Sequence, residues 1–108
     1  MEDIEKFLYI NELFARYGKL LTAKQQEIMT LYFLFNYSLQ EVSENLHISR
    51  SAVSDAIKKA SAHLVKYEDK LGINKKQKAI NKLIEKLNET SLSPLQTELL
   101  ENISKELQ

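Results

Sequence analysis

The sequence predicts an all-α protein with a helix-turn-helix near its middle. Apolar residues recur at spacings of three and four along most of the chain, which is the pattern of amphipathic helices. Only two Gly and one Pro occur in 108 residues, so a few long helices are favoured over many short strands. A chain of this length can bury one core but not two.

Two helices are expected before the helix-turn-helix. The first ends near Gly18, a residue that helix ends prefer, and the second begins at Thr22, where Gln25 completes a capping box. Asn36 and Tyr37 break the second helix. The expected core positions are Ile4, Phe7, Leu8, Ile10, Leu13, Phe14 and Tyr17 in the first helix, and Ile28, Leu31, Tyr32, Leu34 and Phe35 in the second.

The helix-turn-helix is predicted over residues 38–67. Ser38 caps a short helix with Glu41 at the capping-box position, and Ser49 caps a second helix after a turn at His47. Two helical turns, a three-residue turn and a second capped helix are the spacing of a DNA-binding helix-turn-helix. Apolar residues stand where the two helices and the turn must pack, namely Val42, Leu46, Ile48, Val53 and Ile57.

The second of these helices is predicted to continue to about Lys70 and to end at Gly72. Its apolar residues follow a heptad pattern, which can pack inside the protein or form a homodimer. Internal packing is favoured because a globule this small needs each of its apolar stripes. The seam consists of Val53, Ile57, Ala60, Leu64, Tyr67 and Leu71.

Residues 73–108 are predicted as a helical extension that packs on the same core as residues 1–72. A basic amphipathic helix covers Lys75–Leu87, and Ser93 and Pro94 begin a final acidic helix. Residues 73–76 or 88–93 are the expected flexible joints. A narrow stripe on the final helix is expected to dock on the body of the protein, or alternatively to bind a partner, and consists of Leu95, Leu99, Ile103 and Leu107.

The formal net charge of zero conceals an uneven distribution. Residues 1–46 carry −3, residues 47–87 carry +6 and residues 88–108 carry −3. A basic centre with acidic flanks suits a localised contact with a polyanion, and the alternative is a lysine-rich solvated surface.

The candidate nucleic-acid site lies on the helix that follows Ser49. Arg50 is the only arginine near the turn and Asp55 repels phosphates, so direct reading of bases is expected to be weak. Lysines can hold phosphates without reading sequence. The predicted contact residues are Arg50, Ser51, Ser54, Asp55, Lys58, Lys59 and Lys66, and a secondary basic patch, alternatively a solvated face, consists of Lys75, Lys76, Lys78 and Lys82.

Catalysis, a metal site and a cofactor are not expected. There is no Cys, no phosphate-cradling Gly loop, and His47 and His63 stand sixteen residues apart without a carboxylate motif. His47 is explained by the turn and His63 by the helix surface. The first residues lack a basic targeting region, and no apolar run approaches about 18 residues, so a cytoplasmic protein without membrane insertion is expected.

Two resemblances follow from these motifs. Residues 21–64 resemble the C-terminal helix-turn-helix of bacterial sigma factors, in Leu21-Thr22, Ser38 with Glu41-Val42, and the turn Leu46-x-Ile48-Ser49. A larger part of the chain resembles the YlxM-type family of small helix-turn-helix proteins. The motifs that carry this likeness are Asn11-x-Leu13, Leu20-Leu21-Thr22-x-Lys24-Gln25, Leu31-Tyr32, Ile48-Ser49-Arg50-x-Ala52-Val53 and Tyr67-Glu68-x-Lys70-Leu71.

The YlxM-type resemblance implies an accessory or regulatory role in the signal recognition particle pathway, with the particle's RNA or its GTPase as partner. The sigma-like core implies an alternative, a transcription regulator that binds double-stranded DNA. Two departures matter: His47 stands where sigma-type turns have glycine, and Phe35-Asn36 replaces a pair that is acidic in many YlxM-type proteins.

Overall fold

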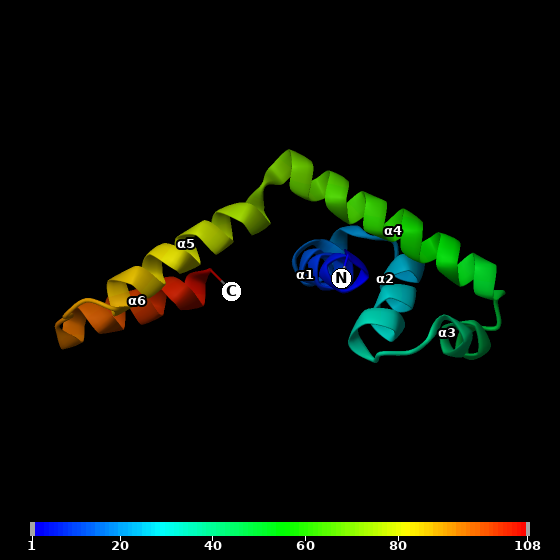
Figure 1. Cartoon of the computed structure of the whole chain (residues 1–108), viewed down its shortest axis with the longest axis horizontal. Coiled ribbons are helices and arrows are strands. Elements are labelled where there is room, and N and C mark those ends of the chain that lie inside the picture. The colour runs from blue at the N-terminus through cyan, green and yellow to red at the C-terminus, as the bar shows by residue number, and fades with distance from the viewer. Residues whose placement is uncertain (1, 108) are drawn as a thin grey trace. The chain divides into compact units, whose positions relative to one another are not determined.

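The computed structural model describes residues 2–107, and this part of the chain is built of helices without a strand (Figure 1). The prediction of an all-α protein is confirmed. Met1 and Gln108, the outer ends of the predicted ranges 1–72 and 73–108, lie outside the described residues. The elements are α1 Glu2–Tyr17, the 3₁₀ helix η1 Gly18–Leu20, α2 Ala23–Met29, the π-helix η2 Thr30–Leu34, α3 Leu39–Leu46, α4 Arg50–Leu71, α5 Ile73–Asn88 and α6 Pro94–Glu106.

The chain divides into two compact units, the first ending at Leu71 and the second beginning at Gly72. The first unit holds α1 to α4 and the second holds α5 and α6. Packing of residues 73–108 on the core of the first unit stays a prediction.

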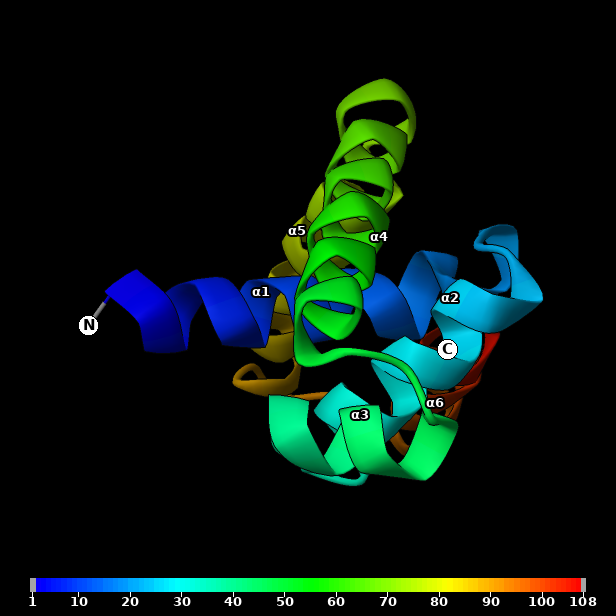
Figure 2. The ribbon, with the colours of Figure 1, turned by 90° about the vertical axis from the view of Figure 1, so that its right-hand side faces the viewer.

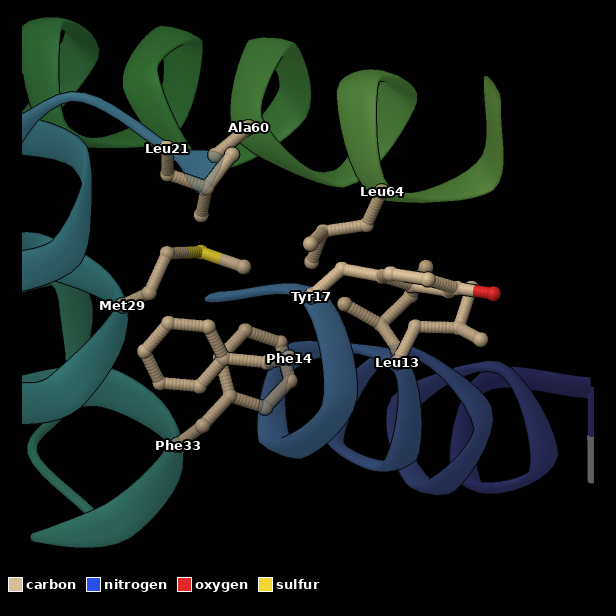
Figure 3. Packing of buried hydrophobic residues seen from close by; sticks show 9 residues of the cluster. Leu13, Phe14, Tyr17, Leu21, Met29, Phe33, Ala60 and Leu64 are labelled. Atoms are coloured by element: carbon tan, nitrogen blue, oxygen red, sulfur yellow. The ribbon is translucent and has the colours of Figure 1, made fainter. Parts of the chain in front are cut away.

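In the first unit α4 crosses α1 and lies over α2 and α3 (Figures 1 and 2). Figure 3 shows Leu64 pointing from α4 toward Leu13 and Tyr17 of α1. A second, smaller cluster joins α4 to α2 and α3 through Val53, Ile28 and Val42. The main cluster consists of Ile10, Leu13, Phe14, Tyr17, Leu21, Met29, Phe33, Ala60 and Leu64.

The heptad seam of α4 packs inside the first unit, as predicted, over most of its length. Val53, Ala60 and Leu64 are fully buried, while Ile57 and Tyr67 are partly buried against the two clusters. The last seam residue, Leu71, is 50% exposed. A hydrogen bond of 2.6 Å from the Tyr17 hydroxyl to Glu68 Oε1 also joins α1 to α4.

Four expected core residues of the first two helices are exposed instead. Ile4 and Leu8 lie in the first turns of α1, which extend beyond α4 in Figure 2. The exposure of Leu34 and Phe35 is explained by the π-helix, in which Phe35 N–H donates to Thr30 O at 3.1 Å. A π turn holds one residue more than an α turn, so the residues after it are rotated away from the face that a 3.6 period predicts. Phe33 is buried in their place.

In the second unit α5 and α6 lie side by side and run in opposite directions (Figure 1), and we call them the C-terminal hairpin. Ser93 caps α6 in a capping box with Gln96, and Pro94 is the first helical residue, as predicted. The predicted joint at residues 73–76 is wrong, because α5 begins at Ile73, directly after Gly72 with its φ of 63°. Residues 89–93 connect the helices.

The predicted stripe of the final helix contributes little to the inside of the hairpin. Leu95, Leu99 and Ile103 are exposed, and the buried apolar side chains of the hairpin are Ile84 and Leu100. Docking of this stripe on the first unit stays a prediction.

Truncation at the two ends of the α4 seam tests the packing. We expect Leu64→Ala to lower the free energy of unfolding by about 2–5 kcal/mol, because it leaves a cavity in a closed cluster. Leu71→Ala, the matched change at the exposed end, should cost less than about 1 kcal/mol. Denaturant titration followed by circular dichroism measures both, and equal losses would contradict the packing described.

Candidate nucleic-acid interface

The first helix of the helix-turn-helix, α3, has defined ends. At its start Ser38 Oγ accepts from Glu41 N–H at 3.0 Å, and Glu41 Oε1 accepts from Ser38 N–H at 2.9 Å. At its end His47 adopts a left-handed conformation, with φ 57° and ψ 42°. The His47 N–H donates to the Ser43 carbonyl, so the sharp turn still satisfies a backbone donor.

Serine hydroxyls hold the turn itself. Ser43 Oγ donates to Ile48 O at 2.5 Å, and Ser49 Oγ accepts from Ala52 N–H at 3.0 Å, which caps α4 as predicted. Beneath the turn, Val42 and Val53 are fully buried, and the other three predicted scaffold residues pack partly buried against them. The predicted helix-turn-helix is therefore present, with all five apolar positions in use.

Six of the seven predicted contact residues are exposed on α4. The seven are Arg50, Ser51, Asp55, Lys58, Lys59 and Lys66, which are exposed, and Ser54, which is half-buried. By the helical period, Arg50 and Ser54 lie toward one edge of the exposed surface. The other five lie opposite the buried seam, and we call these five the outward face of α4: Ser51, Asp55, Lys58, Lys59 and Lys66.

The structure adds a residue that sequence analysis missed. A cavity of about 200 Å³ lies where α1 meets α4, and Lys6 of α1 and Lys58 of α4 both line it. Asp3, Tyr32 and Ser61 line the same cavity. Lys6 and Lys58 stand 52 positions apart in the sequence, and only the crossing of the two helices brings them to one place. No local pattern around Lys6 indicates this.

The remaining candidates have separate places. The predicted secondary basic patch is exposed on α5, in the second unit, and consists of Lys75, Lys76, Lys78 and Lys82. This patch and the lysines of α4 therefore belong to different units. His63 is exposed on α4, and its ring centre lies 6.4 Å from that of Tyr67. Within residues 2–107 no cluster of three or more His, Asp and Glu could hold a metal ion. No helix in the same range is long and apolar enough to cross a membrane.

A family model described as "Putative helix-turn-helix protein, YlxM / p13 like" matches residues 4–104. The chain belongs to this family. The match covers nearly all of both units, so the C-terminal hairpin is part of the family's shared sequence. The description of the YlxM/p13-like family names no enzymatic activity.

Relatives of the YlxM/p13-like family come from several bacteria. A protein of Caldanaerobacter subterraneus subsp. tengcongensis is 51% identical over 89 residues, 82% of this chain and 74% of its own length. A protein of Bacillus pumilus is 41% identical over 97% of this chain and 96% of its own. The YlxM protein of Bacillus subtilis is 42% identical over 81% of this chain and 79% of its own length.

The left-handed residue in the turn gives a test of the site's backbone. At His47, glycine should be more stabilising than alanine by about 1 kcal/mol, because an L side chain with φ near 57° is strained. At Asn45, inside α3, alanine should be better than glycine by about the same amount. Unfolding free energies of the four variants measure this, and the same preference at both positions would contradict the turn geometry.

Proposed function

We propose that this protein is an accessory or regulatory component of the signal recognition particle pathway that binds the particle's RNA through α4. The observation that supports binding to a nucleic acid is the set of exposed lysines on the outward face, Lys58, Lys59 and Lys66. These lysines lie opposite fully buried residues, so packing holds them toward solvent. The particle is proposed because the motifs of the chain resemble those of YlxM-type proteins.

The composition of the outward face favours RNA over a DNA operator. A-form RNA has a deep, narrow major groove that side chains cannot read, and proteins recognise such helices through phosphates and shape. Lysines supply phosphate contacts, and this face needs no base reader for that purpose. Asp55 lies within the face and repels phosphates, so the contact is centred on Lys58 and Lys59 rather than on the first turn of α4.

A second candidate is a transcription regulator that inserts α4 into the major groove of duplex DNA. The cap at Ser49 and the short α3 favour this candidate, because they reproduce the helix-turn-helix of DNA-binding proteins. Arg50 would then be the main base reader, since arginine pairs with guanine by two hydrogen bonds.

Binding titrations against the particle's RNA and against random genomic duplex, each at two salt concentrations, test the proposal. We expect saturable binding to the RNA that survives an excess of duplex. Lys58→Ala should weaken this binding and lower the slope of log affinity against log salt by about one phosphate contact. Lys19→Ala removes the same charge from η1, outside the outward face of α4, and should leave the slope unchanged.

Two outcomes would contradict the RNA proposal. A strong preference for one duplex sequence, lost in Arg50→Ala, would support the transcription regulator instead. Binding to neither nucleic acid, together with binding to the particle's GTPase, would show that the lysines of α4 are a solvated surface.

A further inference from the structure

The C-terminal hairpin has its polar and apolar residues in an unusual arrangement. A cleft of about 340 Å³ between α5 and α6 is lined mainly by polar side chains, among them Asn81, Asn88 and Ser104. Six other large apolar residues of the two helices are between 38% and 64% exposed. They are Ile80, Leu83 and Leu87 on α5, and Leu95, Leu99 and Ile103 on α6.

These exposed residues share one side of the hairpin. On α5 the helical period places Ile80, Leu83 and Leu87 together, turned away from the polar residues of the cleft. Leu99 and Ile103 lie in the corresponding position on α6, relative to Leu100 and Ser104. Two antiparallel helices are related by an approximate two-fold axis, so both sets lie on the same side. We call these six residues the apolar side of the hairpin.

A unit of this kind does not bury enough surface by itself. The second unit has fewer than 40 residues, and units that small usually need disulfides, metals or association with another chain. The chain contains no Cys. Exposed apolar patches of several branched residues on soluble proteins mark sites of interaction.

The charges of the two helices indicate which partner fits. Five lysines and one glutamate give α5 a net charge of +4, while three glutamates and one lysine give α6 a net charge of −2. Lys76 lies within the apolar side along α5 and Lys86 borders it, and Glu98 and Glu106 border it along α6. A two-fold pairing that sets α5 against the α6 of another hairpin brings opposite charges together at both edges.

We propose that the apolar side of the C-terminal hairpin binds the same side of a second copy of this chain, forming a four-helix bundle at the centre of a homodimer. In this dimer α5 of each chain faces α6 of its partner, and α5 does not face α5 because both carry a high positive charge. The heptad seam of α4 is already buried within its own unit, so the hairpin rather than that seam joins the two chains.

Sedimentation velocity of the full chain over a range of concentrations tests the proposal. We expect a dimer whose dissociation constant rises at least about tenfold in Leu83→Glu. Leu34→Glu is the matched control, because Leu34 lies in the first unit and both leucines are 59% exposed. It should leave the dimer intact, and circular dichroism should show that both variants keep the helical content of the original chain.

A charge-reversal series tests the facing of the helices. Lys76→Glu with Lys86→Glu should weaken the dimer, and adding Glu98→Lys with Glu106→Lys to the same chain should restore it. Because α5 also lies against the α6 of its own chain, circular dichroism must show that the hairpin stays helical in both variants. Loss and restoration of the dimer with the helical content unchanged is then the result expected when α5 lies against the partner's α6. A charge-reversed monomer that the second pair of changes leaves monomeric would overturn this pairing.

Three other results would overturn the dimer. The first is an original chain that stays monomeric while Leu83→Glu lowers its melting temperature, which would place the hairpin on its own first unit. The second is a dimer that survives Leu83→Glu. The third is a monomer whose stability Leu83→Glu leaves unchanged, which would leave the apolar side free for a different protein.

Discussion

Val53, Ala60 and Leu64 are fully buried in α4, and the arrangement of the rest of the first unit depends on this seam. Val53 belongs to the cluster beneath the helix-turn-helix, while Ala60 and Leu64 belong to the main cluster with α1. One stiff helix of 22 residues, about 33 Å long, is therefore fixed at two places by different contacts. Because the helix cannot rotate, the side opposite the seam is fixed in solvent.

The turn before α4 sets where this seam begins. A left-handed residue at His47 turns the chain sharply between α3 and α4, and the hydroxyls of Ser43 and Ser49 bind backbone groups at this turn. Among the described residues, no buried side-chain nitrogen or oxygen lacks a hydrogen-bond partner. The strain at one residue is thus offset by hydrogen bonds and by the burial of Val42 and Val53 on either side.

Features that depend on local chemistry could be predicted from the sequence, and features that depend on distant contacts could not. The capping boxes at Thr22, Ser38 and Ser93 lie where the sequence places them, since a cap involves only residues within one turn. The π-helix, which exposes Leu34, and the mainly polar cleft of the hairpin have no signature in hydrophobic periodicity. The proximity of Lys6 to Lys58 has no such signature either, because it results from the crossing of α1 and α4.

The distribution of charge along α4 limits where a polyanion can approach. Asp55 lies on the outward face about one turn before Lys58 and Lys59, so a phosphate near the start of the helix meets a carboxylate. Beyond it come Lys58, which lines a cavity together with Lys6 of α1, and Lys59, and Lys66 follows about 12 Å beyond Lys58 along the axis. The exposed lysines of the outward face therefore lie from the middle of α4 onward. A recognition helix that reads bases contacts them with its first turns. In α4 the lysines lie further along the helix, where a phosphate backbone could lie across it.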